Sequence, residues 1–191
     1  MKTHLLMAAV QVLMLGATVA NSSPEVFLDC DPLATGQQQE AYVDPGETFE
    51  VGVFGASLLD LDTFDIEVVV GDFEGSVVFD TEMIEVNPEF GGTCGFIRMV
   101  EYLSPSHFVV SASIVGQDEE CAPDGDFLLF KILLTAVGDV GDKASIHLVS
   151  ARMIDVSGDL FVVSGGGGFI STGDIVWSDR ETWSSVRMMY R

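Results

Sequence analysis

Hydrophobic residues along this chain recur mainly at every second position, which is the period of a β-strand. In residues 64–70, apolar side chains alternate with Asp65 and Glu67. Because successive side chains of a strand point to opposite faces, this pattern predicts a strand with one buried and one solvated side. Residues 48–53 and 108–114 alternate in the same way and predict two more strands of this kind.

A further segment, residues 127–137, is apolar on both faces except at Lys131 and Thr135. This composition is typical of a strand in the middle of a packed sheet. No stretch within residues 24–177 keeps a helical period for three turns. We therefore predict an all-β fold, a jelly-roll-like, two-sheet antiparallel β-sandwich of eight or nine strands. Turn signals rich in Gly, Asp and Pro separate the strands, at residues 44–46, 91–92, 124–126, 138–142, 157–159 and 165–168.

The N-terminus has the order of a secretory signal peptide. Lys2 precedes an almost wholly apolar run, and small residues follow near residue 20. The alternative is a retained membrane anchor, but the run is shorter than the roughly 20 residues that cross a bilayer and contains Gln11. We expect residues 1–20 to be removed, leaving a secreted chain, extracellular or at the cell surface, without a membrane span.

The C-terminal residues 178–191 differ from the rest of the chain. Ser178 begins a segment that can cap a helix, and Trp183 and Val186 then recur at helical spacing ahead of a basic end. This predicts a short amphipathic C-terminal helix. Two roles stay open for it: packing onto the sandwich, or acting as a sorting or attachment tail.

The charge of the chain narrows the range of partners. It contains 30 acidic and 8 basic residues, a net charge of −22. Residues 21–179 hold only four of the basic residues. Such a surface repels phosphates, which argues against nucleic acid and anionic lipid as partners. The alternative is that the charge only keeps an exported protein soluble. The length fits one domain, residues 24–177.

Three cysteines in an exported chain favour a disulfide. Residues 96–103 and 108–115 read as a hairpin with its turn at 104–107, so Cys94 and Cys121 both lie beyond its open end. We predict a Cys94–Cys121 disulfide and leave the pairing of Cys30 open.

The residues favour binding over catalysis. One compact sandwich leaves no insertion for a cleft and no Cys/His metal cluster, so we expect no enzyme, no catalytic residue and no cofactor. The glycine run at 165–168 lacks the Lys and Ser/Thr of a phosphate loop and reads as a hairpin loop. Two acidic clusters are candidates for a structural calcium ion, with loop solvation as the alternative: Asp60 with Asp62, and Asp118, Glu119 and Glu120 with Asp124 and Asp126.

Four segments, in order, resemble a known module. Residues 43–51 (VDPGETFEV), 61–68 (LDTFDIEV), 126–132 (DFLLFKI) and 150–160 (SARMIDVSGDL) are similar to strand motifs of the cohesin domain of cellulosome scaffolds. The third segment lacks the glycine that usually follows its aspartate.

The resemblance implies binding of a dockerin, a small calcium-loaded helical partner carried by enzymes. It places the partner on a sheet face that includes the third strand, where Thr63, Asp65 and Glu67 point outward in this chain. The alternative is that these three side chains are merely solvated.

A polysaccharide ligand is the other hypothesis. Sugar-binding faces need exposed aromatic rings in a row, and the sandwich offers Tyr42 and Tyr102 but no Trp before Trp177. We therefore favour a secreted, non-catalytic recognition module that binds a dockerin-like protein in extracellular polysaccharide degradation or surface assembly, with direct polysaccharide binding as the alternative.

Overall fold

The structure is a computed structural model, which describes residues 23–31, 36–72, 79–116, 119–137, 139, 141, 143–163 and 167–172. The expected signal peptide (1–20) and C-terminal helix (178–191) lie outside the described residues, as does Asp118.

Eleven strands and one 3-10 turn make up the described chain. The strands are β1 (Glu25–Asp29), β2 (Glu40–Val43), β3 (Thr48–Leu58), β4 (Leu61–Asp72), β5 (Phe79–Val86), β6 (Phe96–Ser104), β7 (His107–Ile114), β8 (Gly125–Ala136), β9 (Lys143–Asp155), β10 (Leu160–Val163) and β11 (Gly167–Thr172), and the 3-10 turn is Glu119–Cys121.

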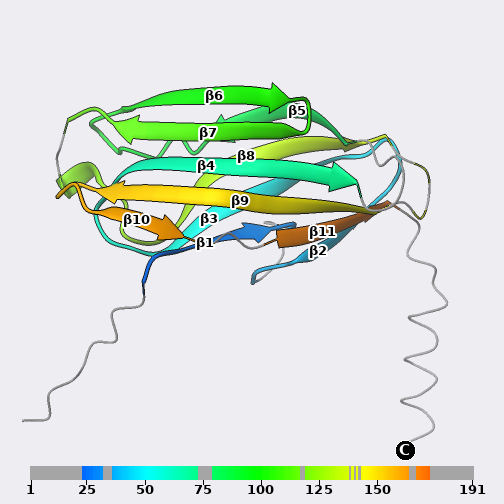
Figure 1. Cartoon of the computed structure of the whole chain (residues 1–191), viewed down its shortest axis with the longest axis horizontal. Helices are drawn as coiled ribbons and strands as arrows, with labels where there is room; N and C mark the ends of the chain where they lie inside the picture. The colour runs from blue at the N-terminus through cyan, green and yellow to red at the C-terminus, as the bar shows by residue number, and fades with distance from the viewer. Residues whose placement is uncertain are drawn as a thin grey trace, which may run out of the picture.

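The strands form two sheets that pack face to face (Figure 1). The four-stranded sheet has the order β1-β3-β8-β5, and the seven-stranded sheet has the order β2-β11-β9-β4-β7-β6, with β10 also paired to β9. All pairs are antiparallel except β2 with β11, which is parallel. The predicted all-β, two-sheet fold is confirmed.

The number of strands is larger than the predicted eight or nine, for a physical reason at both ends of the sandwich. Near the N-terminus the chain changes sheet, so that β1 pairs with β3 in one sheet and β2 with β11 in the other. Near the C-terminus, β10 and β11 pair with the two halves of the long strand β9. β10 and β11 therefore lie one after the other along β9 and do not pair with each other, so the hairpin predicted from the glycine run at 165–168 is wrong.

The core lies between the sheets and contains a cluster of phenylalanines. The Phe64 ring lies 5.1 Å from that of Phe90 and 6.0 Å from that of Phe130, centre to centre, and all three side chains are fully buried. Ile66 and Val68 are also fully buried. The alternation seen in residues 64–70 therefore marks the buried side of β4.

A disulfide joins Cys94, in the turn before β6, to Cys121 in the 3-10 turn, with the two Cα atoms 6.0 Å apart. Cys30 is buried at the end of β1, and its Sγ lies 3.7 Å from the carbonyl oxygen of Gln39.

Candidate partner-binding face

The three residues transferred from the resemblance lie together on one surface. β4 runs through the interior of the seven-stranded sheet, between β7 and β9. Thr63, Asp65 and Glu67 alternate with buried residues of β4 and are partly exposed on the outer side of this sheet. The structure thus brings all three residues onto the same face of one strand.

Their cross-strand neighbours are mostly polar. On β7, Ser113 is opposite Thr63 and Ser111 is opposite Asp65. On β9, Arg152 is opposite Asp65. Cross-strand neighbours on one face are close enough for their side chains to interact. The centre of the face is therefore a polar stripe that we define by Thr63, Asp65, Glu67, Ser111, Ser113, Ser150 and Arg152.

Hydrogen bonds order the first part of this stripe. The Thr63 hydroxyl donates to a carboxylate oxygen of Asp62 at 2.8 Å, and its oxygen lies 2.9 Å from the Ser113 hydroxyl. Asp65 accepts one long hydrogen bond among the described residues, 3.4 Å from the Ser111 hydroxyl. A bond of this length is weak, so the Asp65 carboxylate keeps most of its capacity to accept hydrogen bonds.

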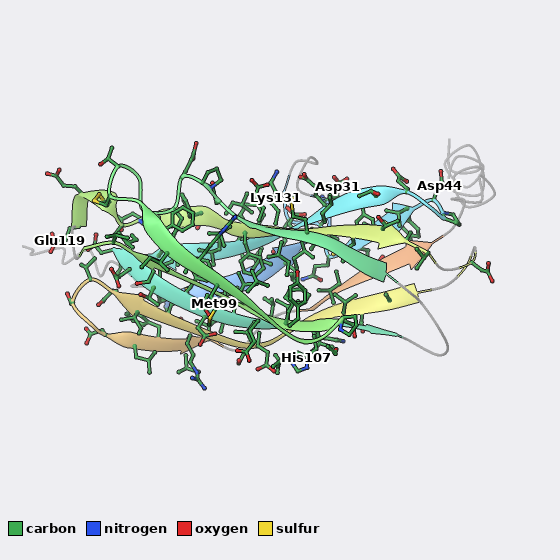
Figure 2. All side chains as sticks on the ribbon, turned by 90° about the horizontal axis from the view of Figure 1, so that it is seen from above. Asp31, Asp44, Met99, His107, Glu119 and Lys131 are labelled. Carbon is green, nitrogen blue, oxygen red and sulfur yellow. A yellow bond between two sulfur atoms is a disulfide. The ribbon has the colours of Figure 1, made fainter. Side chains whose placement is uncertain are left out.

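Glu67 is held more firmly than Asp65. Its Oε1 lies 2.6 Å from Nε2 of His107, and its Oε2 accepts a hydrogen bond from the Ser150 hydroxyl at 3.1 Å. The His107 hydrogen bond, aided by Ser150 and by the positive charge of Arg152, lowers the pKa of the Glu67 carboxyl despite some desolvation. Figure 2 shows His107 on the outer side of the seven-stranded sheet and, for orientation, Lys131 of β8 on the outer side of the other sheet.

Exposed aliphatic side chains border the polar stripe on both sides. On β6, Ile97 is 70% and Met99 57% exposed, and on β10, Leu160 is 58% and Val162 72% exposed. We call these two pairs the aliphatic shoulders.

Sequence reasoning missed the shoulders, because neither segment alternates. Residues 96–100 and 160–163 are almost continuously apolar, and nothing in such a run tells which side chains face outward. The strand order, which the structure supplies and the sequence does not, places β6 and β10 at opposite borders of this face.

The exposed aromatic residues do not form a row. Tyr42 and Tyr102 are 59% and 53% exposed, but they lie on β2 and β6, the two ends of the seven-stranded sheet. Phe27 and Phe54 stack on each other with ring centres 5.4 Å apart, and both are only partly exposed. Among the described residues no flat aromatic platform of the kind that binds sugar chains is formed.

Two of the candidate calcium ligands, Asp124 and Asp126, accept hydrogen bonds from loop backbone, whereas Oδ1 of Asp62 is buried without a hydrogen-bond partner among the described residues. Asp124 accepts a hydrogen bond from the backbone N–H of Asp60 at 2.7 Å, and Asp126 accepts one from that of Ser57 at 3.2 Å. These bonds fix the turn between β3 and β4, where Ser57 and Asp60 have positive φ angles of 54° and 47°. In the described part of the chain, no group of three or more His, Cys, Asp or Glu side chains is arranged to hold a metal ion. A search of the same residues for a helix with the length and apolarity of a membrane crossing found none.

Comparison with known proteins found similarity in structure only. No family model and no curated protein matches the sequence. A cohesin in a type I cohesin–dockerin complex from Clostridium thermocellum superposes with a TM-score of 0.61 at 13% identity, covering 79% of this chain and 99% of that one.

Two cohesins from other settings give similar values. A non-cellulosomal cohesin from the hyperthermophilic archaeon Archaeoglobus fulgidus has a TM-score of 0.58 at 11% identity, covering 84% of this chain and 98% of that one. The cohesin module of a family 33 glycoside hydrolase from Clostridium perfringens has a TM-score of 0.57 at 13% identity, covering 79% and 97%. The predicted resemblance is confirmed at the level of the fold: this chain carries a cohesin-like domain.

Proposed function

We propose that this chain is an exported, non-catalytic recognition module that binds a dockerin-like protein through the outer face of β6, β7, β4, β9 and β10. The partner contacts Thr63 and Asp65 directly, and Glu67 shapes the surface beside them. The work of such a module is assembly, at the cell surface or outside the cell, of proteins that include polysaccharide-degrading enzymes.

The observation that carries the proposal is the composition of this face, together with its place on a cohesin-like fold. A protein interface combines an apolar surface with polar groups that fix the orientation of the partner. Here the central polar stripe contains the carboxylate of Asp65, which accepts a single long hydrogen bond among the described residues, and the stripe lies between two exposed aliphatic shoulders. A partner bound here covers both shoulders and gives Asp65 a hydrogen-bond donor.

The comparisons support a protein-binding role. The similar cohesin from Clostridium thermocellum was solved in complex with a dockerin. The Archaeoglobus fulgidus relative is described as non-cellulosomal, so this fold also occurs outside cellulosomes.

Export rests on the N-terminal sequence and on the disulfide. The order of Lys2, an apolar run and small residues is that of a secretory signal. A disulfide between Cys94 and Cys121 persists in oxidising compartments, which agrees with a location outside the cytoplasm.

The test is a selection against the purified full chain. A displayed library of calcium-loaded dockerin modules with randomised helix surfaces is panned on the chain, and the recovered dockerins are measured by titration calorimetry against two variants. Asp65→Arg replaces the open carboxylate of the face, and Glu85→Arg makes the same change at an exposed position of β5 in the other sheet.

We expect Asp65→Arg to weaken binding at least about tenfold, because it sets a cation against donors of the partner, and Glu85→Arg to leave it unchanged. Asp65→Asn, which keeps the shape, shows a smaller loss. Circular dichroism confirms that each variant is folded. A selection that yields no binder, or binders indifferent to Asp65→Arg, contradicts the proposed function.

A further inference from the structure

We propose that residues 178–191 of this chain bind in a groove of its own sandwich, between β2 and β3. The Trp183 side chain fills the groove, and Arg187 and Arg191 pair with carboxylates along it. The groove shares no residue with the candidate partner-binding face, so the two sites are independent of each other.

Two strand edges without a neighbouring strand border this groove. β2 is the last strand of the seven-stranded sheet and pairs, among the described residues, only with β11 (Figure 1). On β3, the pairing with β1 covers residues 52–56 and ends before residues 48–51. All four residues of β2 and residues 47–50 line the groove, whose volume is about 460 Å³. Because an open edge is a template for pairing with another chain, proteins cover such edges, and a segment bound here would do so.

The base of the groove is apolar. Cys30 and Val43 are buried, and Phe49 is partly buried against the core. Tyr42 also lines the groove and is 59% exposed. Aromatic side chains contribute a large apolar contact area, and a volume of this size has room for one more ring beside Tyr42.

Four carboxylates line the same groove, those of Asp31, Glu40, Glu47 and Glu50. Lys131 pairs with Glu50, and Glu47 accepts the backbone N–H of Asp44. No ion pair within the described part of the chain neutralises Asp31 or Glu40, and both residues are exposed. The groove therefore suits an aromatic side chain that is accompanied by cations.

The end of β11 brings the chain close to this groove. In the parallel pair of β11 with β2, Thr172 is opposite Val43, which lines the groove. Residues 173–182 separate Thr172 from Trp183, and ten extended residues reach up to about 35 Å. The four residues of β2 are only about 13 Å long, so Trp183 is within reach of the whole groove.

Charge complementarity selects this segment as the occupant. Three of the 8 basic residues of the chain fall within residues 178–191, and residues 182–191 contain no acid. On a chain of net charge −22, such a segment is attracted to carboxylates that lack a cation. A tether of ten residues holds the segment beside its own groove at an effective concentration of about millimolar, which favours this groove over that of a second copy.

Tryptophan fluorescence tests the proposal directly, because Trp177 and Trp183 are the only tryptophans of the chain. In the full chain carrying Trp177→Phe, the emission comes from Trp183 alone. The groove variant Asp31→Lys/Glu40→Lys, made in this background, sets two cations against Arg187 and Arg191. We expect acrylamide to quench Trp183 about threefold more strongly in the groove variant, with emission at longer wavelength, because like charges drive the segment out.

The matched control is Glu85→Lys/Glu89→Lys. It makes the same change of charge at two exposed positions that line a different acidic groove, beside Asp126 and Lys131. We expect this control to be quenched like the original chain. Circular dichroism confirms that each variant is folded, and mass spectrometry confirms that residues 178–191 are present.

A charge swap tests direct contact between the segment and the groove. Arg187→Glu/Arg191→Glu should expose Trp183 without changing the sandwich. Combining it with Asp31→Lys/Glu40→Lys should protect Trp183 again, because opposite charges then meet across the contact. Tyr42→Ser should also raise the quenching, whereas Tyr102→Ser, which removes a ring that is 53% exposed on β6, should not.

The proposal is wrong if Trp183 of the original chain is quenched as strongly as a free peptide of residues 178–191. It is also wrong if Glu85→Lys/Glu89→Lys exposes Trp183 while the groove variant does not, since the segment then binds the other groove. Protection that disappears on dilution, together with a dimer seen by light scattering, would mean that the segment of a second copy fills the groove.

Discussion

Two carboxylates, two residues apart on β4, have different surroundings. Glu67 uses both oxygens, one with His107 and one with Ser150, whereas Asp65 has only a long contact to Ser111 among the described residues. A carboxylate whose hydrogen bonds are already made gains little from a new partner. Under the proposed function we therefore expect Asp65 to contact the partner, whereas Glu67 links β4 to β7 through His107 and to β9 through Ser150.

The lowered pKa of Glu67 predicts a pH-dependent contribution to stability. Because its folded-state pKa lies below the ordinary value of 4.5, the stabilisation is fully present above that value and is lost as the pH falls through the folded-state pKa. Glu67→Gln should therefore destabilise the protein at neutral pH, and the difference should shrink below about pH 4.5. Urea unfolding between pH 7 and 3 measures it. Glu85→Gln, at an exposed position of β5, is the control, and an equal pH trend for both variants would contradict the assignment.

The backbone conformation and close packing at Gly91 lead to a second prediction. It has φ of +80°, and a Cβ there would lie 2.6 Å from the carbonyl oxygen of Gly95. Gly91→Ala should cost about 1–3 kcal/mol, from the left-handed backbone and from the clash. Gly95 has φ of +75° and open space around a Cβ, so Gly95→Ala carries the backbone strain alone. Chemical denaturation of both variants gives the difference, and equal losses would exclude the clash.

At the scale of elements, predictability from sequence depends on whether a strand has two unlike faces. The alternation in β4 and β7 could be read directly, because each strand separates the core from a polar outer surface. In β6 both sides are largely exposed at an edge of the sheet, so its apolar run revealed no orientation and Ile97 and Met99 were missed as surface residues. The His107–Glu67 contact depends on the register of two strands 40 residues apart, which no local pattern contains.

The disulfide is the covalent link between elements. It closes a loop over a sequence separation of 27 residues, which includes the whole β6–β7 hairpin. Cross-linking a loop of this size restricts the unfolded chain, so the double variant Cys94→Ser/Cys121→Ser should lose about 2–4 kcal/mol. Urea unfolding with and without reductant measures the loss. Reductant should bring the original chain close to the double variant and leave the variant itself unchanged; a variant as stable as the original would show that the hairpin needs no cross-link.

At the scale of the whole molecule, the net charge of −22 opposes compaction. Lys131 pairs with Glu50, and His107 lies 2.6 Å from Glu67 but is charged only when protonated. With 30 acidic residues against 8 basic ones, most of the carboxylates lack a cation of their own to offset their repulsion. The apolar core stabilises the sandwich, and repulsion between the like charges on its surface destabilises it.

Salt should therefore stabilise this protein. Screening shortens the range of repulsion from about 30 Å at 0.01 M salt to a few ångströms near 1 M, so the melting temperature at neutral pH should rise with added NaCl. The matched comparison is the same titration near the sequence pI of about 4.1, where the net charge is close to zero. There the rise should be much smaller, because little net repulsion is left to screen. Calorimetric melting curves at both pH values measure the effect. An equal rise in melting temperature at both would mean that salt acts on apolar burial. No rise at neutral pH would mean that repulsion between the surface carboxylates does not lower the stability of the folded protein.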